Sequence, residues 1–131
     1  MENSIETKTA LISKIDNGII RVEIKDHAVL EASSLDENYK AYTYLSENKG
    51  APFLILVNET ATISVEGRKE YNAKNNREIR LADALVIKNP ATMLLINSQV
   101  KFIKTKVPTQ AFLDEKSALR WLQKFAVTEA V

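Results

Sequence analysis

Cysteine and histidine, the residues that most often carry nucleophilic or metal chemistry, are almost missing from this sequence. There is no cysteine, and His27 is the only histidine. The lack of cysteine excludes thiol nucleophiles, disulfides and cysteine-based zinc sites. His27 lies in a Lys-Asp-His turn, where an isolated imidazole is usually only solvated, and no further metal ligands are spaced around it. We therefore predict no metal, no cofactor and no catalytic residue.

Glycine is too sparse for the loops that bind phosphates. The three glycines, Gly18, Gly50 and Gly67, lie far apart, so the sequence has neither a P-loop nor a dinucleotide-binding fingerprint. Residues for a Ser-His-Asp triad are present, but the Gly-x-Ser-x-Gly elbow is missing. The prediction is a protein that is not an enzyme.

The clustered charges have structural explanations. Asp36-Glu37 and Asp114-Glu115 stand at expected helix starts, where acidic side chains complement the helix dipole. Lys101, Lys104 and Lys106 form a short basic run. This run is either a solvated face or a contact for an acidic partner.

One polar loop is the strongest candidate for a binding site. It follows the apolar run 53–57 and leads into a helix that we expect to begin at Ser64. Open α/β sheets bind their ligands beyond the carboxyl ends of strands, and the amides of a helix start favour anions or a partner's carboxylate. The alternative is a plain crossover loop. The candidate partner or ligand surface consists of Asn58, Glu59, Thr60, Thr62, Ser64 and Glu66.

The composition is that of one globular domain. The chain has 131 residues, of which 45% are hydrophobic and 27% charged, and we expect a flexible segment at 1–8 and a domain at 9–128. With 18 basic and 17 acidic side chains, a nucleic-acid partner is not expected. No apolar run approaches the ~20 residues that span a bilayer. The amino-terminal residues also lack signal-peptide features, so we expect a cytoplasmic protein.

The first half of the chain predicts a hairpin and a helix. Residues 9–15 and 19–24 alternate in polarity around Asn17-Gly18, the strongest short hairpin signal. A short strand is expected at 28–31. Ser34-Leu35-Asp36-Glu37 reads as a capping box, and Lys49-Gly50 as a left-handed helix end.

The second half predicts strands alternating with helices. Runs 53–57 and 81–87 have the composition of buried parallel strands. A helix is expected from Ser64 to about Asn75, and a last strand at 107–112, where Pro108 favours a sheet edge. Asp114 is expected to cap the final helix.

The helix expected at 90–102 is apolar on two sides. Leu94 and Leu95 belong to one side, while Met93 and Ile96 belong to the other. Deep burial is the favoured explanation. A contact surface, which would make a homodimer plausible, is the alternative.

The element order predicts a single α/β domain with a mostly parallel sheet and an antiparallel opening hairpin. Three stretches carry a resemblance to a known fold: Ala51 to Asn58, Ala82 to Val86, and Pro108 to Glu115 with the Ala-Leu-x-Trp-Leu helix at 118–122. They resemble the STAS-like domains, which include the bacterial anti-sigma-factor antagonists and relate loosely to lipid-transfer CRAL-TRIO domains. The resemblance implies a STAS-like mixed sheet over nearly the whole chain.

The antagonists' phosphorylation switch is not carried over by this resemblance. Its Asp-Ser-Ser-Gly stretch corresponds to Ser64-Val65-Glu66-Gly67, so Val65 and Glu66 occupy the two serine positions. A carboxylate supplies only about half the charge of a phosphate. Glu66 is therefore better explained as a solvated residue at a helix start.

The leading functional prediction is a non-enzymatic, STAS-like interaction or regulatory module that uses the loop at 58–64 and the following helix. The alternative is a small-molecule or lipid-binding module with an apolar pocket near the helix at 90–102. The resemblance motivates the first prediction, and the largely apolar helix motivates the second.

Overall fold

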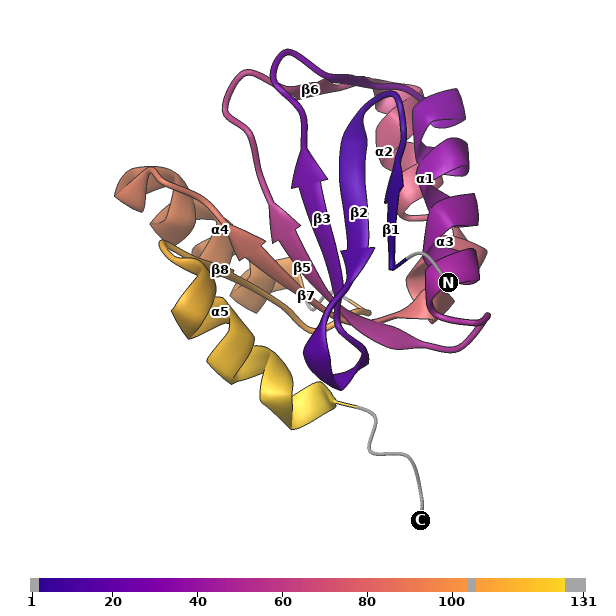
Figure 1. Cartoon of the computed structure of the whole chain (residues 1–131). Helices are drawn as coiled ribbons and strands as arrows, with labels where there is room; N and C mark the ends of the chain where they lie inside the picture. Colours follow the sequence, from indigo (N-terminus) through magenta and orange to yellow (C-terminus); the bar gives the residue numbers. More distant parts are fainter. Residues whose placement is uncertain (1–2, 104–105, 127–131) are drawn as a thin grey trace.

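The computed structural model describes residues 3–103 and 106–126 and confirms an α/β fold around one mixed sheet (Figure 1). The sheet order is β1-β2-β3-β5-β7-β8. Its strands are β1 (Ser4–Glu6), β2 (Ala10–Lys14), β3 (Ile20–Ile24), β5 (Ala51–Leu56), β7 (Arg80–Val86) and β8 (Thr109–Phe112). The helices are α1 (Ala32–Leu45), α2 (Val65–Tyr71), α3 (Lys74–Ile79), α4 (Pro90–Ile103) and α5 (Glu115–Leu122).

The predicted hairpin is confirmed, and a third strand extends it. Strands β2 and β3 pair antiparallel, and the turn between them places Asn17 and Gly18 at φ 65° and 72°, which these residue types tolerate. Residues 4–6 lie in the segment expected to be flexible, but they form β1 and pair with β2. The amino-terminal polar residues therefore extend the sheet.

Helix α1 begins and ends earlier than the sequence predicted. Its cap is Glu31, and Ser34 instead donates a hydrogen bond from its hydroxyl to the Val29 carbonyl at 3.3 Å. The left-handed residues at its end are Glu47 and Asn48, with φ of 58° and 61°. The Asn48 amide reaches the Thr43 carbonyl at 2.7 Å, so a Schellman-like turn ends the helix before Gly50.

The segment between β5 and β7 also differs from the prediction. A two-residue strand, β6 (Thr62–Ile63), pairs in parallel with β4 (Val29–Leu30) as a small second sheet. Helix α2 then begins after Ser64, as predicted, because the Ser64 hydroxyl accepts from the Gly67 amide at 2.9 Å. The prediction of one continuous helix to Asn75 was wrong, because the helix ends before Asn72 and a second helix, α3, begins after Ala73.

The sheet separates two apolar clusters. On one face, Ile20, Val22 and Phe53 pack against Tyr42 and Leu45 of α1, while Ile79 closes the cluster from the end of α3. The other face is covered by α5. Its Ala118 and Leu122 pack on Ile19, Leu54, Ala82 and Ala84. Central strands such as β5 are therefore buried on both faces, as the apolar runs predicted.

Helix α4 packs against β8, the edge strand of the sheet. The Asn97 side-chain amide forms two hydrogen bonds with the backbone of Ala111 in β8, accepting from its amide at 2.8 Å and donating to its carbonyl at 3.1 Å. The side chain thereby protects an edge strand, as a neighbouring strand would. Deep burial of α4 was the wrong prediction, because Leu94 and Leu95 remain 63% and 58% exposed.

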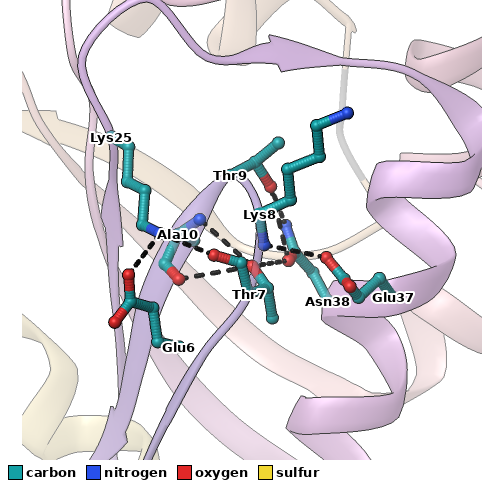
Figure 2. Close-up of polar contacts among 8 residues, drawn as sticks. All are labelled: Glu6, Thr7, Lys8, Thr9, Ala10, Lys25, Glu37 and Asn38. Carbon is teal, nitrogen blue, oxygen red and sulfur yellow. Dashed lines mark hydrogen bonds and ion pairs between the residues drawn. The ribbon is translucent and has the colours of Figure 1, made fainter.

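A buried polar network fastens α1 to the turn between β1 and β2 (Figure 2). The Thr7 hydroxyl donates to Asn38 Oδ1 at 2.6 Å, and Asn38 Nδ2 donates to the Thr9 hydroxyl at 3.2 Å. At the surface, Glu37 accepts from the Lys8 amide at 3.0 Å. The network holds the amino-terminal half of α1 over the sheet.

Candidate functional site

The sheet face that carries α1 to α3 is only partly covered at the carboxyl ends of its strands. The register places Val22, Ile55 and Leu85 side by side across β3, β5 and β7. Ile24 at the end of β3, Val57 just after β5 and Ile87 just after β7 follow two residues further along and also line the open region. These side chains form the apolar floor of a groove.

The groove has walls from elements that are far apart in the sequence. Leu35, Asn38 and Tyr42 come from α1, and Tyr71 comes from α2. The β4–β6 sheet contributes Leu30, Thr62 and Ile63, and Thr92 and Ile96 project from α4 on the far side. The groove is open on one side and has a volume of about 650 Å³, which is within the usual range for a small-molecule site.

A buried ion pair lies behind the wall formed by Tyr71. Arg80 and Asp83 are 4% and 2% exposed, and the Arg80 guanidinium donates to Asp83 Oδ2. Arg80 also donates to the Asn76 and Tyr71 carbonyls at 3.1 and 2.8 Å, and it lies 3.8 Å from the centre of the Tyr71 ring. The arrangement is a compact charged cluster inside an otherwise apolar layer.

The environment of this cluster keeps the neighbouring phenols neutral. The Tyr71 hydroxyl donates to Asp83 Oδ2 at 2.8 Å. Burial, followed by the Asp83 charge, raises the pKa of Tyr71, and burial also raises the pKa of Tyr42. Desolvation raises the pKa of Asp83 as well, and it outweighs the opposing effect of Arg80.

Three of the predicted site residues line the groove. Asn58, Glu59 and Thr62 lie on its rim. Asn58 Nδ2 donates to Asp26 Oδ1 at 2.6 Å, while its Oδ1 accepts from the Thr60 amide and hydroxyl at 3.0 and 2.7 Å. Thr60 in turn accepts from the His27 amide at 2.7 Å. The loop is therefore tied to the turn after β3.

Ser64 and Glu66 lie apart from these rim residues. The Ser64 amide donates to the Leu30 carbonyl at 3.0 Å, and the Ser64 hydroxyl caps α2. Glu66 is exposed in the first turn of α2. The structure therefore brings together only part of the predicted surface, and hydrogen bonds within the chain occupy much of its polar capacity.

Sequence reasoning missed Tyr42, Tyr71, Arg80 and Asp83 as neighbours of a site. Asp83 entered only within the stretch Ala82 to Val86 that carries the fold resemblance, and the other three residues were assigned no role in a site. One signal was available: a carboxylate within the apolar strand 81–87 must be paired or neutralised when it is buried. Its partners could not be read from the sequence.

Two further properties are seen in the part of the chain that the structure describes. None of its helices combines the length and apolarity that crossing a bilayer requires. No group of three or more potential metal-ligating side chains comes together in residues 3–103 and 106–126.

The fold is that of the SpoIIAA-like proteins, which confirms the predicted STAS-like architecture. A similar solved structure is an uncharacterised DUF3478-family protein with a SpoIIAA-like fold from Shewanella loihica PV-4. It matches with a TM-score of 0.58 and 15% sequence identity, over 93% of this chain and 98% of that chain. At this identity the likeness establishes the fold alone.

The chain belongs to the DUF7793 family, described as a domain of unknown function, whose model matches residues 13–126. No curated protein matches the sequence.

Proposed function

We propose that this protein is a binding module that holds a small, largely apolar molecule in the groove above β3, β5 and β7. The observation that carries the proposal is the partly open end of this sheet face, where the half-buried Ile55 and Leu85 and the exposed Val57 line the groove. Burial of apolar surface stabilises by roughly 25 cal/mol per Å². An apolar ligand would supply the missing cover.

The position of α4 supports this function. The helix is held at the edge of β8 through Asn97, so it flanks the groove with Thr92 and Ile96. The groove opens at the carboxyl ends of parallel strands, where α/β sheets usually bind ligands. Helix α4, whose apolar composition is evident from the sequence, thus forms one wall of the groove.

Filling the groove should abolish binding without disturbing the fold. Thr92 is exposed on the groove side of α4, so Thr92→Trp should occupy the site and weaken binding of the neutral fluorophore Nile red by at least about tenfold. Ser98→Trp places the same side chain on an exposed position of α4 outside the groove lining and should change the affinity less than about twofold.

Fluorescence titration measures the affinity of both variants for Nile red. Native mass spectrometry of the wild-type protein purified from cells should show a co-purifying ligand mass. Nile red that does not bind the wild type, together with a clean apo spectrum, would overturn the proposal. Equal weakening by both tryptophans would show that the probe binds elsewhere.

A protein-interaction or regulatory module is the second candidate. Its supporting observation is the exposure of Val29 and Val65, at 53% and 63%, beside Ser64 and Glu66. Ile63 is exposed on the same β4–β6 sheet. Apolar side chains rimmed by polar residues are typical of protein contacts.

A pull-down with matched variants tests this surface. Ser64→Asp combined with Glu66→Lys should release a partner that the wild-type protein retains, since it changes the polar rim of the exposed valines. Glu78→Lys, at an exposed position of α3, reverses a glutamate charge elsewhere and should retain that partner. An identical set of retained proteins for all three forms would count against the candidate.

A further inference from the structure

The inner end of the groove carries neutral hydrogen-bonding groups. Tyr42 packs its ring edge-on against Phe53, with 4.8 Å between the ring centres. Tyr71 lies beside it with its hydroxyl proton directed at Asp83. Since burial raises the pKa of both phenols, they remain uncharged hydrogen-bonding groups at neutral pH.

The charge that reaches the groove is negative. Glu59 is the only charged side chain among the described residues that line it. The Asp83 carboxylate lies behind Tyr71, and its Oδ1 has no hydrogen-bond partner among the described residues. The guanidinium of Arg80 points to the Asn76 and Tyr71 carbonyls and to Asp83, so this cation is already engaged within the chain.

The two polar ends are separated by an apolar stretch. From Phe53 to Val57, four residue steps along β5 and just past its end span about 13 Å, and Glu59 follows two residues beyond Val57. A molecule that lies along this stretch meets apolar side chains in its middle and polar atoms at its ends. An anionic head would lose water without meeting a cation among the described lining residues, which is costly.

We infer that the groove selects an uncharged amphiphile, an apolar chain with one hydrogen-bonding group such as a long-chain alcohol, and that Glu59 disfavours the corresponding carboxylate. The inference rests on the proposed ligand-binding function and names the ligand class of the same site. Glu59 acts as a specificity-determining residue through its charge at the rim.

The test compares 1-dodecanol with dodecanoate as competitors of Nile red. At about pH 8 the carboxylate is fully ionised, and an ionic strength of about 10 mM preserves surface electrostatics. Dodecanol should displace the probe from the wild type at a concentration about tenfold or more below that of dodecanoate. Glu59→Lys should reduce this preference by about fivefold, and Glu59→Gln by a smaller factor.

The matched control is Glu78→Lys, which makes the same charge reversal at an exposed position outside the groove lining and should leave the preference unchanged. Equal displacement by dodecanoate and dodecanol on the wild type, or the same preference in Glu59→Lys as in Glu78→Lys, would overturn the assignment of ligand class. In that case, if the competitors displace Nile red from the wild type and Thr92→Trp abolishes this binding, the groove would still be supported as a binding site. Failure of Nile red and both competitors to bind would overturn the proposed function itself.

Discussion

Arg80→Met should destabilise the protein by about 3–5 kcal/mol at neutral pH, the usual cost of leaving one member of a buried ion pair unpaired. Methionine approximates the length of the arginine stem, so loss of volume is a minor contribution. The substitution removes the donor to Asp83 and the bonds to the Asn76 and Tyr71 carbonyls. Urea unfolding followed by circular dichroism measures the loss.

The loss in Arg80→Met should become smaller as the pH falls toward about 5. Desolvation already raises the pKa of Asp83 in the wild type, and removal of the Arg80 charge raises it further. A folded-state pKa above the unfolded value means that the folded protein binds the proton more readily. Stability therefore rises as the pH drops from above the folded pKa toward the unfolded pKa.

Two further variants separate charge from packing. Adding Asp83→Asn to Arg80→Met removes the unpaired carboxylate but keeps an acceptor for Tyr71, so it should recover much of the loss at neutral pH. Lys74→Met disrupts the Lys74–Glu78 pair of α3, whose side chains are 82% and 65% exposed, and should cost less than about 0.5 kcal/mol. A loss in Arg80→Met that is similarly small, or independent of pH, would contradict a charge-compensating role for Arg80.

Gly67→Ala should destabilise the protein by about 3 kcal/mol, although alanine ordinarily favours a helix over glycine by about 1 kcal/mol. A Cβ at this position would lie 2.2 Å from the Leu30 carbonyl oxygen and 3.1 Å from Ile63 Cγ1. The first contact is to backbone, which cannot move aside by a side-chain rotation. Helix α2 would have to shift away from the β4–β6 sheet.

Thermal unfolding measures this effect, and Gly50→Ala is the matched control. The closest atom to a Cβ there is Leu81 Cδ2, at 2.9 Å, and a leucine side chain can adjust. The Gly50 variant should therefore lose clearly less stability. Because Leu30 and Ile63 also line the groove, Gly67→Ala should weaken Nile red binding at temperatures where it stays folded. If Gly67→Ala were as stable as the wild type or more stable, α2 would not pack this closely against the β4–β6 sheet.

The local order of the elements was predictable because each depends on neighbours in the sequence. Asn17-Gly18 provided two residues that accept positive φ, and Ser64 and Asp114 provided side chains that accept from helix-start amides. The same local rules misplaced the ends of α1, since Glu31 and Asn48 performed roles expected of Ser34 and Gly50. Several residue types can occupy a helix end, and the packing of the helix decides among them.

The candidate site was only partly predictable, because it depends on contacts between distant segments. The loop at 58–64 was placed correctly beyond a buried strand, since strand ends can be recognised from an apolar run and its boundaries. One wall of the groove is α4, which Asn97 holds at the sheet edge by pairing with the backbone of Ala111. No pattern within the helix indicates that pairing, so its apolar residues suggested burial.

By itself, the sequence determined the type and order of most of the main elements, the mixed α/β class and the shortage of residues for metal or thiol chemistry. Periodicity, caps and composition are local quantities, and they suffice for these conclusions. Only the tertiary structure decided that Tyr42, Tyr71 and the Arg80–Asp83 pair meet at one end of an apolar groove. The reason is that strand order and helix placement are set by packing across the whole sheet.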